Sequence, residues 1–260
     1  LFLSALSLGN WFFEILKWKT LASIVQPLSF KMVIRQSLAA LTVSLSTPYR
    51  IGDYGAKAMF FRSENRKKIV LLNFFSNSIQ MGVTTFFGII GLAMTLRDFE
   101  ISLSLPKVLL FLLSLVIIAL LFIFLREKEF LIKGLTVSRV LKYVRKIPVR
   151  VKIRVLIYST LRYILFSILF YYLLISFGAV LSLQKAMPLI LTMYLLVSII
   201  PSIFIFDLVI RGGVAVWLFS FAHIAEIISL STALTMWSLN FVIPALWGSF
   251  YVLTFKKVEK

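Results

Sequence analysis

The chain has 260 residues, of which 60% are hydrophobic and 15% are charged, and its mean hydropathy is +0.99. An average soluble domain has roughly 45–50% apolar and about 25% charged residues. A chain this apolar cannot bury its surface inside one water-soluble core, which excludes a soluble enzyme. The composition predicts an all-α polytopic membrane protein.

The charge is strongly basic, with 28 Lys and Arg against 10 Asp and Glu and a net charge of +18. In a soluble protein this balance would suggest nucleic acid. In a membrane protein, basic residues collect in cytoplasmic loops and meet anionic lipid head groups. We therefore expect membrane phospholipids with anionic head groups as partners and no nucleic acid. Whether the chain forms a homo-oligomer stays open.

Apolar runs predict the membrane helices, because a helix that crosses about 30 Å of hydrocarbon needs about 20 apolar residues. The first run is 1–16, ended by Lys17, Trp18 and Lys19. The later runs are 27–46, 69–96, 106–125, 155–177, 187–206, 209–221 and 227–255. A short helix over 54–61 follows a break at 47–53. Residue 1 is Leu inside an apolar run, so we expect residues before it and treat 1–260 as a single transmembrane domain.

Basic clusters predict which connections are cytoplasmic. Ten of the 28 cations lie in 126–154, where basic and apolar residues alternate at helical spacing. That spacing indicates an amphipathic helix on the inner leaflet. Further clusters lie at 62–68 and 256–260, so we expect a multi-pass protein of the inner cell membrane with a cytoplasmic C-terminus. The connections near 97–107 and 178–185 are then external.

The parity of the crossings predicts two broken hairpins that enter from opposite faces. If Lys17 and the 62–68 cluster are both cytoplasmic, residues 27–61 enter and leave from the inside, with Pro48–Asp53 as the break. Residues 186–226 start and finish outside, with a break at Pro201–Gly213, as a re-entrant hairpin or as two full crossings. Such an inverted repeat of Pro/Gly-broken helices is typical of transporters whose site lies at the breaks. Ordinary helices joined by tight turns are the alternative.

Ionisable residues within membrane spans are costly and mark candidate binding sites. Each break has a cation, an anion and glycine: Arg50, Gly52 and Asp53 in the first, and Arg211, Asp207 and Gly212 in the second. A helix beginning at Gly52 or Gly212 would point free N–H groups at a lipid phosphate. The planar guanidinium of Arg50 or Arg211 also suits phosphate. The alternative is that each Asp caps its helix and pairs with the neighbouring Arg.

Other polar residues inside the spans extend this candidate site. Arg35 and Arg162 would attract phosphate into the cavity, unless their long side chains reach back to the interface. Asn73, Asn77 and Gln80 share one helix face and would line a pathway for the head group. The alternative for these three is that they hold helices together.

The sequence has few residues that indicate a metal site or an enzyme active site. His223 and Glu226 are three residues apart and would share a helix face. With no Cys and one His, we expect no metal site and no cofactor. The acidic pair Asp98 and Glu100 would serve a membrane-embedded glycosyltransferase or lipid-modifying enzyme. A structural subunit that recruits partners through 126–154 is a third class.

Two segments resemble the flippase-like transmembrane domain of the lysylphosphatidylglycerol synthase family. They are Asn10–Trp18 with Thr47–Asp53, and the later Pro201–Gly213 run, although Asp53 and Tyr49 depart from the residues common there. The resemblance implies a flippase-type transporter that moves an anionic phospholipid or a lipid-linked head group between leaflets. It does not imply synthase activity, because the soluble aminoacyl-transfer domain is absent from these residues.

Overall fold

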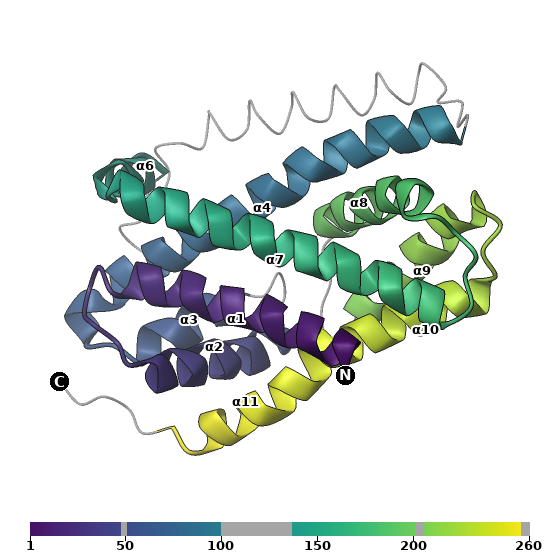
Figure 1. The fold of residues 1–260 in the computed structure, drawn as a ribbon. Coiled ribbons are helices and arrows are strands. Elements are labelled where there is room, and N and C mark those ends of the chain that lie inside the picture. Colours follow the sequence, from purple (N-terminus) through teal and green to yellow (C-terminus); the bar gives the residue numbers. More distant parts are fainter. Residues whose placement is uncertain (48–50, 100–136, 201–204, 256–260) are drawn as a thin grey trace.

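The computed structural model describes residues 1–47, 51–99, 137–200 and 205–255. Within these ranges the chain forms helices and no strand, which confirms the predicted all-α fold (Figure 1). The helices are α1 (Phe2–Ala22), α2 (Phe30–Leu45), α3 (Gly52–Met59), α4 (Ser63–Asp98), α6 (Val137–Lys146), α7 (Val149–Ser176), α8 (Leu183–Ile199), α9 (Ile205–Ser220), α10 (Glu226–Trp237), the π-helix η2 (Ser238–Val242) and α11 (Ile243–Leu253).

Three stretches of helix are long and apolar enough to cross a membrane, which is consistent with a membrane protein: α4, α7 and the continuous stretch Glu226–Leu253. The longest, α4, has 36 residues and is about 54 Å long at 1.5 Å per residue. Several of its large apolar side chains, among them Phe74, Phe86 and Ile89, are exposed. The span expected at 106–125 lies outside the described residues.

The hydrophobic core is divided into two large clusters and a small one. The first joins α7, α8 and α9 through residues such as Phe170, Leu189 and Phe219. The second joins α1, α2 and α4 through Trp18, Val33 and Leu72, among others. The third is formed by Leu41, Trp237 and Phe241, from α2, α10 and η2.

Close helix packing connects the two large clusters through α4 and α8. A Cβ added to Gly88 would lie 2.5 Å from Cβ of Leu195, and one added to Gly91 would lie 2.5 Å from Cβ of Leu191. Both distances are far below van der Waals contact, so only glycine permits this approach. Small residues are the usual means by which membrane helices come close together.

The two predicted breaks differ in where the following helix begins. At the first break α3 begins at Gly52, two residues before the predicted start at 54, and packs against α2. At the second break α9 begins at Ile205, so the prediction of a helix that begins at Gly212 is wrong. A glycine inside a helix costs only about 1 kcal/mol, and Asp207 in the first turn favours the earlier start. Pro48 and Pro201 lie outside the described residues.

Two further predictions about helix boundaries are wrong. We expected the first helix to end at Lys17, but α1 continues to Ala22 and the Lys17 side chain is 1% exposed. The ammonium of Lys17 is tolerated there because it pairs with Glu14 at 2.7 Å. His223 and Glu226 do not share a helix face, because His223 lies in a turn with φ +56° and Glu226 begins α10.

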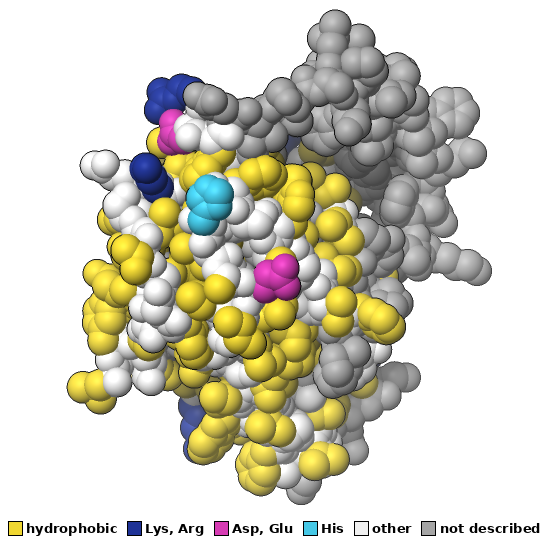
Figure 2. All heavy atoms as spheres, turned by 90° about the vertical axis from the view of Figure 1, so that its right-hand side faces the viewer, with side chains coloured by type: hydrophobic (Ala, Val, Ile, Leu, Met, Phe, Trp, Pro, Cys, Tyr) yellow, Lys and Arg dark blue, Asp and Glu magenta, His cyan; other side chains and the backbone are white. Residues whose placement is uncertain are grey.

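The expected amphipathic helix is present as α6, but its apolar face packs against the protein. Tyr143 and Val144 are half-buried against the second cluster, whereas Lys142, Arg145 and Lys146 are exposed. The starts of α4, α6 and α7 lie together at one end of the molecule (Figure 1). The opposite face shows mostly hydrophobic side chains and few charged ones (Figure 2). Among the described residues, exposed cations are therefore concentrated at the end that holds α6.

Candidate functional site

A cavity of about 580 Å³ is lined by side chains from α1, α2, α3, α4, α7, α8, α9 and η2. Members of the first hydrophobic cluster (Tyr163 and Tyr194) and of the third (Leu41 and Phe241) form part of its wall. Its volume falls in the range of about 300–1,000 Å³ that is usual for small-molecule sites.

The cavity is partly open, and we place its opening near the middle of α4, where residues of its lining are exposed. Ser78 and Met81 line the cavity and are also exposed on that helix. Their exposed neighbours along the helix, Phe74 and Phe86, are large and apolar. The polar interior therefore reaches the outside through a hydrophobic surface, about halfway along the longest helix.

Glu14 is the centre of the first group of charges. Its Oε2 lies 2.7 Å from Nζ of Lys17 and 2.6 Å from Nη1 of Arg162, and its Oε1 lies 4.0 Å from Nζ of Lys57. The Glu14 side chain is 12% exposed. A carboxylate this buried is stable because several cations surround it. The contacts join α1, α3 and α7.

Asp53 is the centre of the second group, in the first turn of α3. Its carboxylate lies 3.1 Å from Nζ of Lys57 and accepts hydrogen bonds from Nδ2 of Asn73 at 2.6 Å and of Asn77 at 3.4 Å. Lys57 also donates to Oδ1 of Asn73 at 3.0 Å. The short helix α3 is thus attached to α4 by a network of ionic and amide contacts.

The third group comes from α9. Nε of Arg211 lies 2.8 Å from Oδ2 of Asp207, one turn earlier on the same helix. The guanidinium also lies over the ring of Phe241 at 5.4 Å, within cation–π range. Arg211 and Phe241 both line the cavity. The second break therefore contributes a cation to the same cavity as Asp53 from the first.

Counted over the residues that the structure describes, these three groups have a net positive charge. The cations are Lys17, Lys57, Arg162 and Arg211, and the anions are Glu14, Asp53 and Asp207, so four minus three gives +1. In surroundings of low dielectric constant, an unbalanced cation attracts an anion strongly. The arrangement suits an anionic group that enters the cavity.

The cavity brings together only some of the predicted site residues. Its lining includes Asp53, Asn77, Gln80, Arg162 and Arg211. Asn73 and Asp207 lie behind the lining and bond to Asp53 and Arg211, respectively. Gly212, inside α9, lies outside the lining.

The remaining predicted site residues make contacts outside the cavity or lie outside the described residues. The N–H of Gly52 donates to the Thr47 hydroxyl at 2.8 Å, so this helix start already has a partner. Arg35 lies outside the cavity lining, donates to the Thr254 carbonyl at 3.0 Å and lies over the Phe60 ring. The expected place of Arg35 inside the cavity is therefore wrong. Arg50 lies outside the described residues.

Sequence reasoning missed three charged residues of the site. Glu14, Lys17 and Lys57 are all close to the cavity, and Glu14 and Lys57 line it. The available signal was spacing, because Glu14 and Lys17 are three apart and Asp53 and Lys57 are four apart, so each pair shares a helix face. Lys17 was assigned instead to a helix end.

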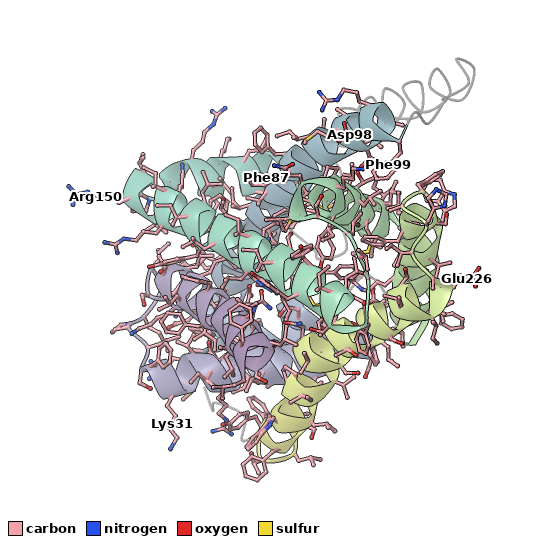
Figure 3. The ribbon with its side chains drawn as sticks, turned by 45° about the vertical axis from the view of Figure 1, so that its right-hand side comes forward. Lys31, Phe87, Asp98, Phe99, Arg150 and Glu226 are labelled. Carbon is pink, nitrogen blue, oxygen red and sulfur yellow. The ribbon has the colours of Figure 1, made fainter. Side chains whose placement is uncertain are left out.

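Asp98 lies away from the cavity, at the end of α4 (Figure 3). It is exposed and pairs with the neighbouring Arg97 at 3.0 Å. Glu100 lies outside the described residues. Among the residues that the structure describes, there is no group of three or more His, Asp or Glu that could hold a metal ion.

The site therefore defines a helical bundle with a basic internal cavity that opens through an apolar surface. Comparison of the chain with protein-family models, with curated proteins and with solved structures found no match. The resemblance seen in the sequence stays a prediction.

Proposed function

We propose that the chain is a membrane transporter of the flippase type, which moves an anionic phospholipid or lipid-linked head group between the leaflets of the inner cell membrane. The observation that carries this proposal is the cavity with a net charge of +1 whose opening lies on the apolar side of α4. An anionic head group would enter beside Ser78 and Met81 and meet Arg162 and Arg211.

The position of the opening favours a lipid over a water-soluble anion. A soluble substrate needs a path from the aqueous face, whereas a lipid head group reaches a side opening while its acyl chains stay in hydrocarbon. The exposed apolar residues around the opening, Phe74 and Phe86, would contact those chains. Hydrocarbon around a polar cavity is the environment expected of a pathway between leaflets.

The arrangement of the two breaks also supports a transporter. The α3 helix has 8 residues and is about 12 Å long, which is too short to cross a bilayer and fits a re-entrant hairpin. Side chains that follow each break, Asp53 and Arg211, line one cavity, as expected for an inverted repeat with its site between the halves. The concentration of cations at the end that holds α6 would make that end cytoplasmic, and with it Phe255, whose ring lies 4.9 Å from that of Phe60. A cytoplasmic C-terminus is part of this proposal.

The runner-up, a lipid-modifying enzyme that uses Asp98 and Glu100, has weaker support. Asp98 is exposed and paired with Arg97, outside the lining of the cavity. A catalytic carboxylate needs a place where a substrate and a second group converge. We therefore favour transport without chemical modification of the lipid.

The test is lipid translocation by the purified protein in vesicles that contain a fluorescent phosphatidylglycerol, read as loss of signal to a membrane-impermeant quencher. Arg162→Gln removes a cavity cation but leaves Glu14 paired with Lys17, so we expect translocation to fall about ten-fold or more, since a hydrogen bond to a charge contributes about 1.5–3 kcal/mol. Arg150→Gln, the same change at an exposed position of α7, is the matched control (Figure 3). Equal rates in Arg162→Gln and wild type, or a wild-type rate no faster than that of empty vesicles, would contradict the proposal.

A further inference from the structure

The C-terminal membrane helix changes its hydrogen-bond register just before Pro244. The N–H of Ile243 donates to the Ser238 carbonyl, five residues back, as in a π-helix. In that register the next donor would be residue 244, but proline has no N–H. The Leu239 carbonyl, which that donor would have reached, instead accepts from the Ser7 hydroxyl of α1 at 3.3 Å. The π-helix η2 is therefore stabilised by a contact with another helix.

Asn240, in the middle of η2, makes the second contact with α1. Its side chain is buried, and its Nδ2 donates to the Met236 carbonyl at 3.0 Å. Its Oδ1 accepts from Nδ2 of Asn10 at 2.9 Å and lies 3.4 Å from the Ser7 hydroxyl, whose single hydrogen it shares with the Leu239 carbonyl. Because a backbone carbonyl can only accept, the contact with Met236 fixes which end of the Asn240 amide faces α1.

The orientation of Asn240 in turn fixes that of Asn10. Since Asn240 presents an acceptor, Asn10 must direct its NH₂ group toward it, which leaves Oδ1 of Asn10 on the other side. That oxygen accepts from Nε of Arg162 at 3.0 Å. If the Asn10 amide were rotated by half a turn, its NH₂ group would face the guanidinium, and neither group could accept.

Arg162 is thereby held at two points. Nε bonds to Asn10 and Nη1 bonds to Glu14 at 2.6 Å. A guanidinium has five donors, so these two contacts leave Nη2 for a ligand in the cavity that Arg162 lines. A side chain fixed in this way loses little further freedom when it binds an anion.

We propose that Asn240 is a positioning residue for Arg162, and that the π-helix before Pro244 places it there. The relay runs from the Met236 carbonyl through Asn240 and Asn10 to the guanidinium. Its consequence for transport rests on the proposed function, in which Arg162 contacts the head group. The placement of Arg162 itself does not.

The first test therefore measures the freedom of Arg162 without any lipid substrate. Phenylglyoxal labels arginine side chains, and mass spectrometry gives the rate at each position, with the exposed Arg150 as the internal reference. In Asn240→Leu we expect Arg162 to be labelled several-fold faster than in wild type. Gln36→Leu is the matched control, because it removes another fully buried amide, one that bonds to Trp18. An unchanged rate at Arg162 in Asn240→Leu would overturn the proposal.

A second variant keeps the test decisive if Asn240→Leu does not fold. Asn240→Ser introduces no apolar bulk, and its shorter hydroxyl cannot reach both Met236 and Asn10. The expected increase at Arg162 is the same, and the same unchanged rate would contradict it.

A double-mutant cycle then separates this proposal from the proposed function. In the vesicle assay, Asn240→Leu alone should slow translocation. In the Arg162→Gln protein the same change should not slow translocation further, because both changes act on one group. Faster labelling of Arg162 in a protein that moves no lipid would contradict the transport function and support the positioning role. If the wild type moves lipid and Asn240→Leu slows translocation equally with and without Arg162, the positioning role is contradicted but the transport function is not.

Discussion

The helices that follow the two predicted breaks, α3 and α9, contain similar charged residues, but the described contacts of these residues differ. At the first break, Asp53 on α3 bonds to Asn73 and Asn77 on α4, and Lys57 extends the network to Glu14 on α1. At the second break, the described contacts join Arg211 to Asp207 within α9 and to the ring of Phe241 on η2. Each helix also has an ion pair four residues apart, Asp53 with Lys57 and Asp207 with Arg211, although α3 has only 8 residues and α9 has 16. A very short helix has few positions for burial, so its charges must be satisfied by its neighbours.

The comparison separates two uses of a charge in an apolar bundle. The first break uses charge to hold a short helix in place, and the second presents a cation, Arg211, beside Phe241 in the cavity wall. Replacements at the first break should therefore affect stability most. Replacements at the second break that change only backbone freedom, such as a glycine to alanine change, should affect stability less.

The largest effect is expected from Lys57→Met. Lys57 is 2% exposed and contacts Asp53, Asn73 and Glu14, so its loss leaves buried carboxylates with too little positive charge. Breaking a buried ion pair costs about 3–5 kcal/mol. We expect a loss of this size in the free energy of unfolding, measured by titration with denaturing detergent. Lys31→Met, at an exposed position of α2, is the control (Figure 3), and an equal effect of both variants would show that the network does not stabilise α3.

An intermediate effect is expected from Gly52→Ala. A Cβ at Gly52 would lie 2.7 Å from the Val43 carbonyl oxygen and 2.8 Å from Oγ1 of Thr47, so α3 would have to move away from α2. Overpacking of this kind costs about 1–3 kcal/mol. Gly55→Ala, three residues further along α3, is the matched control because a Cβ there meets nothing within 4 Å. If Gly52→Ala were as stable as Gly55→Ala, the close contact between α2 and α3 would be wrong.

Much of the fold follows from the sequence, because apolar run length and helix-breaking residues decide where membrane helices form. A short helix after the first break, within two residues of the observed α3, and the spans in α4 and α7 were predicted on this basis. The network around Glu14 was not, because a buried Lys and a Lys at a membrane interface look the same until the partner is placed. Lys17 was read as a helix end, whereas its carboxylate partner lies one turn away on the same face. Contacts between distant segments, such as Asn10 with Asn240, leave no mark in local spacing.

The smallest effect is expected at the second break, from Gly213→Ala. Gly213 lies inside α9, and a Cβ there would meet nothing within 4 Å. Because Ala restricts the unfolded chain and favours helix, the change should stabilise the protein by about 0.5–1 kcal/mol in the same unfolding titration. The sign of the change in unfolding free energy is what distinguishes the two possibilities. The sequence alone suggested a helix start near this glycine, where the backbone would need the extra freedom of glycine. Destabilisation by Gly213→Ala would restore a break at 212–213 and would make the second hairpin resemble the first.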